Sequence, residues 1–189
     1  MKFIVEQLQY APLADDYQRL RIALGKRGEP LNVVVSGSGE IDLRLPIFAS
    51  GKVPALIVTT SAGAKRLSKQ SAPEAVEIRA IGRSARPMRA RAILDEVCRV
   101  SPGRLILVEG GPRLLGDFYA EHLVDEQFLT LAPQIAGREA GDRRLSLVMG
   151  KAFAPSDALW GTLADVRRGS SHLFLRYSFP ASRPRSALG

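Results

Sequence analysis

Residues 104–119 read RLILVEGGPRLLGDFY, and this stretch decides the fold class. Residues 105–108 form a continuous apolar run too short for a helix, as is typical of a strand buried on both faces of a parallel sheet. Gly110 and Gly111 follow, and after Pro112, which suits a first helical turn, apolar residues recur at helical spacing. The sequence therefore predicts a strand, a glycine turn and a helix here.

This predicted turn is a candidate phosphate site. The start of a helix presents free N–H groups and a positive end, and glycines without Cβ atoms let a ligand approach closely. Alternatively, Gly110 and Gly111 only make a tight turn. The stretch by itself leaves both interpretations open.

The segments around this stretch alternate between strands and helices, which is typical of a doubly wound α/β sheet. Strands are predicted at residues 2–8, 31–35, 55–58, 76–81 and 105–108, and helices from Asp15 or Asp16, at 64–69 and at 88–100. Beyond residue 121 the strands at 127–131, 159–166 and 173–179 leave no room for a long helix between the last two, so these form a hairpin. We predict a mixed, mainly parallel sheet flanked by helices, with an antiparallel C-terminal edge.

The composition indicates one soluble domain. The chain has 189 residues, of which 46% are hydrophobic and 24% charged. No apolar run approaches the roughly 20 residues of a membrane span, and residues 1–10 lack the features of a signal peptide, so we expect a cytoplasmic protein without membrane partners. Residues 1–179 are predicted to form the domain and residues 180–189 a polar tail.

The net charge of +8 comes mostly from arginines spread along the chain. Diffuse positive charge attracts phosphorylated small molecules as well as nucleic acid. No element that reads nucleic acid accompanies the charge, so we predict no specific nucleic-acid partner. Cys98 is the single cysteine, and His122 and His172 lack partner residues, so neither a metal site nor a catalytic triad is expected.

Three loops rich in glycine or hydroxyl groups follow predicted parallel strands, at residues 36–39, 59–61 and 110–111. Ligands of open α/β sheets bind outside the carboxyl ends of the strands, so we expect these loops at one edge. None contains the G-x-G-x-x-G fingerprint or a P-loop lysine. Residues 36–39 carry no carboxylate that could bind a ribose diol, which favours NADP over NAD.

Residues 109–112 (EGGP), 123–126 (LVDE), 131–133 (LAP) and the closing segment 166–177 resemble the pyrimidine reductases of riboflavin biosynthesis. These are the reductase half of bifunctional deaminase–reductases and have a dihydrofolate-reductase-like fold. The resemblance spans residues 31–179. It implies an NADPH-dependent reductase that reduces 5-amino-6-(5-phosphoribosylamino)uracil, or a related small heterocycle, by hydride transfer.

The resemblance also implies two groups of NADPH contacts. The residues implied at the pyrophosphate are Gly110, Gly111, Pro112 and Leu114. The residues implied near the 2′-phosphate are Ser36, Gly37, Ser38, Thr59 and Thr60. Glu109 either fixes the turn by accepting backbone hydrogen bonds or contacts the substrate or the nicotinamide ribose. No catalytic residue is assigned.

The family begins with a central strand carrying a Ser-Leu-Asp-Gly-like motif, which this sequence starts too late to contain. Residues 1–10 could match the family's second strand, but they lack its glycine, threonine and arginine. We therefore expect a domain without the family's first strand, and little turnover of the uracil substrate by this chain. The alternative is a non-catalytic NADPH-binding or assembly module of the same fold. Residues 173–177 place apolar side chains on both faces of a strand near the sheet edge, which predicts a homodimer.

Overall fold

The computed structural model describes residues 15–26, 29–82, 88–101, 105–135, 137, 139, 141, 146–153 and 155–180. They fall into two compact units, one ending at Ile106 and the other beginning at Leu107. The strand predicted at residues 2–8 and nearly all of the predicted tail lie outside the described residues. No described helix is long and apolar enough to cross a membrane.

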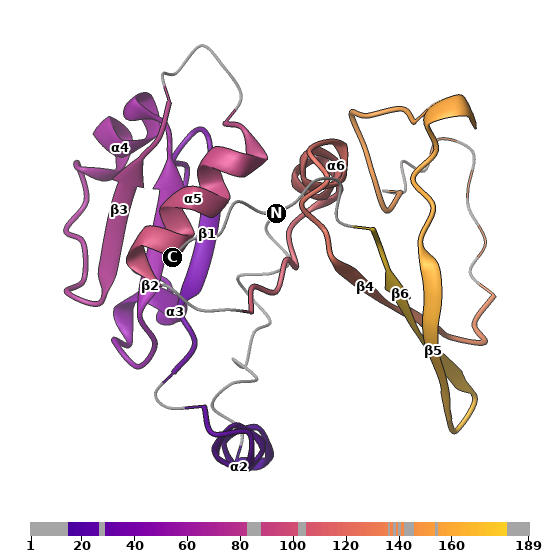
Figure 1. Cartoon of the computed structure of the whole chain (residues 1–189). Coiled ribbons are helices and arrows are strands. Elements are labelled where there is room, and N and C mark those ends of the chain that lie inside the picture. The colour runs from indigo at the N-terminus through magenta and orange to yellow at the C-terminus, as the bar shows by residue number, and fades with distance from the viewer. Residues whose placement is uncertain are drawn as a thin grey trace. The chain divides into compact units, whose positions relative to one another are not determined.

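The first unit is a parallel sheet in the order β1-β2-β3, with helices packed against it (Figure 1). Its strands are β1 (Asn32–Ser36), β2 (Ala55–Thr59) and β3 (Val76–Ala80). Its helices are α2 (Asp15–Ala23), α3 (Pro46–Ala49), α4 (Ser61–Leu67) and α5 (Ala90–Val100). Of these, α4 and α5 contact the strands, whereas α2 has no buried residue. These elements confirm the strands and helices predicted for this part of the chain, with ends shifted by a few residues.

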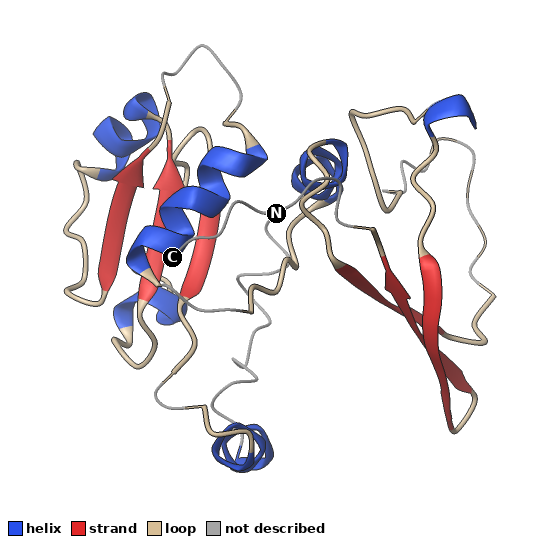
Figure 2. Cartoon of the chain, in the orientation of Figure 1, coloured by secondary structure: helices blue, strands red, loops and turns tan. Residues whose placement is uncertain are grey.

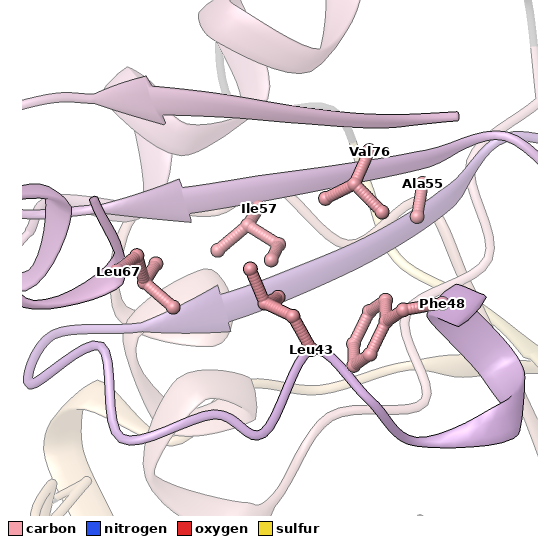
Figure 3. Close-up of a cluster of buried hydrophobic side chains, with 6 residues drawn as sticks. All are labelled: Leu43, Phe48, Ala55, Ile57, Leu67 and Val76. Atoms are coloured by element: carbon pink, nitrogen blue, oxygen red, sulfur yellow. The ribbon is translucent and has the colours of Figure 1, made fainter. Parts of the chain in front are cut away.

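The core of this unit lies on both faces of β2, whose five residues are all buried. On one face Ala55 and Ile57 pack with side chains from the β1–β2 connection and from α4 (Figure 3). Successive strand residues point to opposite faces, so Leu56 and Val58 face the other side, where α5 packs against β2. Burial on both faces explains why residues 55–58 form an uninterrupted apolar run.

The second unit is an antiparallel sheet in the order β4-β6-β5, accompanied by α6 (Figure 2). Its elements are α6 (Pro112–Ala120), β4 (Glu126–Leu131), a short 3₁₀ helix (Pro155–Asp157), β5 (Thr162–Gly169) and β6 (His172–Ser178). The buried Tyr119 of α6 donates a hydrogen bond from its hydroxyl to Gln127 Oε1 at 2.7 Å and stacks edge-on against Phe179. Strands β5 and β6 pair antiparallel, which confirms the predicted C-terminal hairpin.

The prediction of a buried strand at residues 105–108 is wrong. These residues form no strand, and Leu105 and Leu107 are 80% and 74% exposed. A central strand needs a neighbour on each edge for its backbone groups, and no described strand pairs with this segment. Consequently the described residues form two separate sheets, one parallel and one antiparallel, instead of the single mixed sheet expected from the sequence.

Candidate functional site

Two of the three predicted loops lie at the same edge of the parallel sheet. Ser36, the last residue of β1, is paired in register with Thr59, the last residue of β2. The loop of residues 36–39, called the serine loop below, therefore begins beside the Thr59–Thr60 turn, as predicted. The third loop, residues 110–111, belongs to the second unit.

The hydroxyl groups of Thr59 and Thr60 hold the serine loop in place. Thr59 Oγ1 donates to the Ser36 carbonyl oxygen at 2.6 Å, and Thr60 Oγ1 donates to the Gly37 carbonyl oxygen at 2.8 Å. Thr60 Oγ1 also accepts from the Gly63 N–H at 3.1 Å, which caps α4. Both threonines are buried, so they position the loop; direct contact with a cofactor stays a prediction for them.

A contact between two glycines fixes the same loop against α4. Gly39 has a φ of +65°, and a Cβ placed on it would lie 2.7 Å from the Gly63 Cα. A Cβ on Gly63 would collide with Thr59 Oγ1 and would lie 3.1 Å from the Gly37 carbonyl oxygen. Gly63 was not among the residues predicted for this site, although a glycine within a helix is a signal of close packing.

The two serines of the loop keep their hydroxyl protons available. Ser36 Oγ accepts from the Gly39 N–H at 3.2 Å, and Ser38 Oγ accepts from the Glu40 N–H at 3.3 Å. A hydroxyl that accepts still has one O–H to donate. Neither proton has an acceptor within the described part of the chain, so both are free to bind an anion. A phosphate, which offers only acceptors at its charged oxygens, fits this donor pair.

The glycine turn before α6 is accessible at Gly111 and does not use the backbone freedom of glycine. Neither Gly110 nor Gly111 has a positive φ, so this turn does not need glycine for its backbone angles. Gly110 lies under Leu114, whose Cδ2 would be 2.7 Å from an added Cβ. Gly111 is exposed, has nothing within 4 Å of an added Cβ, and precedes Pro112 as an N-cap without a side-chain hydrogen bond. The helix start is therefore accessible.

Glu109 does not fix this turn. Its side chain is exposed and makes no hydrogen bond or ion pair within the described residues, so the expectation that it accepts backbone N–H groups is wrong. A contact with substrate or ribose stays a prediction. Among the described residues, no group of three His, Cys, Asp or Glu side chains is placed to hold a metal ion.

The fold and loops define a class of α/β protein that presents hydroxyl donors at the carboxyl ends of parallel strands. Comparison with protein families makes the assignment specific. The model of the RibD C-terminal domain matches residues 10–152, so this chain belongs to that family of pyrimidine reductases. No curated protein matches the chain.

Solved structures show the same fold at low sequence identity. A pyrimidine reductase-like protein from Corynebacterium diphtheriae matches with a TM-score of 0.65 and 21% identity, over 89% of this chain and 68% of that one. RibD from Acinetobacter baumannii matches with a TM-score of 0.62 and 18% identity, over 83% of this chain and 40% of that one.

A third structure comes from Thermotoga maritima, a diaminohydroxyphosphoribosylaminopyrimidine deaminase/5-amino-6-(5-phosphoribosylamino)uracil reductase. It matches with a TM-score of 0.61 and 17% identity, over 90% of this chain and 44% of that one. This chain thus spans less than half the length of the two RibD-type proteins.

Proposed function

We propose that this chain is an NADPH-dependent reductase of the riboflavin-pathway type. Its substrate would be 5-amino-6-(5-phosphoribosylamino)uracil or a related small heterocycle. Membership of the RibD C-terminal family supports the reaction class. The Thermotoga maritima protein, whose fold is similar, is a deaminase/5-amino-6-(5-phosphoribosylamino)uracil reductase.

The single observation that carries the cofactor assignment is that the hydroxyl protons of Ser36 and Ser38 are available to donate hydrogen bonds. They sit on a loop whose shape is fixed by two threonine hydrogen bonds and a glycine contact. Such a loop offers hydrogen bonds to a phosphate without first reorganising. The accessible start of α6 at Gly111 offers a second anion-binding element, which we assign to the pyrophosphate.

NADPH, when bound, supplies the hydride for the reduction. The residues of this chain then act by binding and orienting. Ser36 and Ser38 hold one end of the cofactor through its 2′-phosphate, and Gly110, Gly111, Pro112 and Leu114 contact the pyrophosphate. Such positioning accounts for a large part of the rate of an enzyme that brings two reactants together.

A non-catalytic NADPH-binding or assembly module is the second candidate. It is favoured by residues 105–108, which form no strand although the sequence predicts a buried one there. Both candidate functions predict NADPH binding, but only the reductase predicts that NADPH is oxidised in the presence of substrate.

Calorimetric titration with NADPH and with NADH tests the assignment, followed by an assay of NADPH oxidation with the uracil substrate. We expect NADPH to bind more tightly than NADH by about tenfold or more, since a charge-assisted phosphate contact is worth a few kcal/mol. Equal affinities would remove the 2′-phosphate assignment. Tight NADPH binding without oxidation would select the non-catalytic module.

A further inference from the structure

Arg66 of α4 lies beside the serine loop, a proximity that the sequence pattern does not predict. Its Nη1 atom forms an ion pair with Glu40 Oε1, and the two residues are 26 positions apart. Glu40 follows Gly39 directly, and its N–H donates to Ser38 Oγ at 3.3 Å. The guanidinium is thus held next to the loop that carries the two donor serines.

Arg66 also faces an open groove of about 600 Å³ that continues from the serine loop. The groove is lined by residues of the 39–42 segment, by Arg44 and by Arg66 and Gln70. Gln70 fixes one wall, because its Nε2 donates to the Ile41 carbonyl oxygen at 2.8 Å and its Oε1 accepts from the Leu43 N–H at 3.1 Å. A ligand that leaves the serine loop on this side meets a preformed surface.

The two arginines of the groove differ in how firmly they are held. Arg44 donates from Nε and Nη2 to both carboxylate oxygens of Asp42 at 2.9 Å each, and its backbone N–H binds the same carboxylate. These hydrogen bonds lower the pKa of Asp42 to about 2. Arg66 makes a single contact to Glu40, and its side chain is 55% exposed. Most of its five N–H donors therefore stay available to a ligand.

We propose that Arg66 is the specificity-determining cation for the phosphate that the serine loop binds. It swings from Glu40 to that phosphate, or bridges the two, when NADPH is present. This inference rests on the proposed function. A guanidinium is matched in shape and charge to a phosphomonoester, and it offsets the repulsion that the Glu40 carboxylate exerts on the same group. A dinucleotide with a bare 2′-hydroxyl gains nothing from Arg66.

The proposal predicts opposite effects for the two members of the ion pair. Titration of the full chain with NADPH and with NADH should show that Arg66→Ala weakens NADPH about tenfold or more, as expected for loss of a charge-assisted contact. Glu40→Gln should tighten NADPH severalfold, because it frees Arg66 and removes a repulsive charge. NADH affinity should stay within about twofold of wild type in both variants.

Lys65→Ala is the matched control, since Lys65 is an exposed cation on the same turn of α4 that does not line the groove. It should leave both affinities unchanged, and Arg66→Lys should restore part of the NADPH affinity. The inference is overturned if Arg66→Ala leaves the ratio of NADPH to NADH affinity unchanged while wild type prefers NADPH. If wild type binds neither dinucleotide, the proposed function fails and the role of Arg66 fails with it.

Discussion

Gly39 and Gly63 are in direct backbone contact, and this contact joins the serine loop to α4. An added Cβ on Gly39 would lie 2.7 Å from the Gly63 Cα, and one on Gly63 would lie 3.1 Å from the Gly39 nitrogen. Both distances are shorter than ordinary van der Waals contact. The position of the Ser36 and Ser38 hydroxyls therefore depends on a residue that itself presents no group to a ligand.

Gly63→Ala should therefore lower both stability and cofactor affinity. The methyl group collides with Thr59 Oγ1 and pushes against the Gly37 carbonyl oxygen, and overpacking of this kind costs about 1–3 kcal/mol. Gly37→Ala is the control for stability, because an added Cβ there has nothing within 4 Å. Thermal denaturation and NADPH titration of both variants provide the measurement. Unchanged values for Gly63→Ala would mean that the loop can move away at no cost.

Gly111→Val should abolish cofactor binding and leave the fold intact. Its φ of −65° and ψ of 165° are accessible to valine, and an added Cβ has no protein atom within 4 Å. The branched side chain would instead occupy the space in front of the first turn of α6. Circular dichroism and NADPH titration check this, with Ala120→Val at the other end of α6 as the control. A folded Gly111→Val variant with normal NADPH affinity would place the pyrophosphate elsewhere.

Local sequence pattern predicted most of the fold because burial and pattern agree in β2 and α5. Residues 55–58 are apolar throughout and buried on both faces, and the buried Ala90, Ile93 and Val97 of α5 recur at helical spacing. Residues 105–108 carry the same apolar signal, yet Leu105, Ile106 and Leu107 are exposed. A local pattern reports which side chains are apolar, and it does not report whether a strand is available to pair with them.

For the candidate site, the position of two loops could be predicted from the sequence, but the contacts that hold them could not. The parallel pairing of Ser36 with Thr59 places two loops at one edge, and this followed from the order of strands and helices. The roles of Thr59 and Thr60 could not be predicted in this way, because their hydrogen bonds depend on strand register. Arg66 and Gly63 were missed for the same reason, since their partners are distant in sequence.

Leu107→Ala tests the conformation of residues 105–108. Leu107 is 74% exposed, so the substitution should change the free energy of unfolding by less than about 0.5 kcal/mol. Ile57→Ala, at a fully buried position of β2, should cost about 2–5 kcal/mol. Chemical denaturation of the two variants gives both values. A loss of several kcal/mol for Leu107→Ala would show that this segment is buried in solution.

The Asp42–Arg44 pair should give a defined dependence on pH. The Arg44 hydrogen bonds lower the pKa of Asp42 from 3.8 to about 2, so the pair stabilises the folded state above pH 3.8. The contribution is lost as the pH falls from 3.8 to about 2. Arg44→Ala should return the pKa of Asp42 toward its ordinary value, which NMR titration of the carboxyl carbon measures. Lys52→Ala, which removes an exposed cation outside this pair, should leave the Asp42 titration unchanged.

We also propose that the chain forms a homodimer through one face of the β4-β6-β5 sheet. The strand register places aliphatic side chains of all three strands on the same face: Leu131, Leu163, Val166 and Leu173. Each is 40–52% exposed. Covering a half-exposed aliphatic side chain is worth about 1 kcal/mol. A second copy would bury four such side chains from each partner, so the association gains from both sides.

Light scattering should therefore report a dimer at micromolar concentration, and Val166→Lys combined with Leu173→Lys should convert it to a monomer. Lysines at these positions place charges on this face, and a charge buried there without a partner is costly. Thr130→Lys is the control, since Thr130 pairs with Phe174 and lies on the opposite face of the sheet. A wild-type monomer would contradict the proposal. If the dimer survives the double substitution but dissociates in Thr130→Lys, the interface lies on the opposite face of the sheet, the one that contains Thr130.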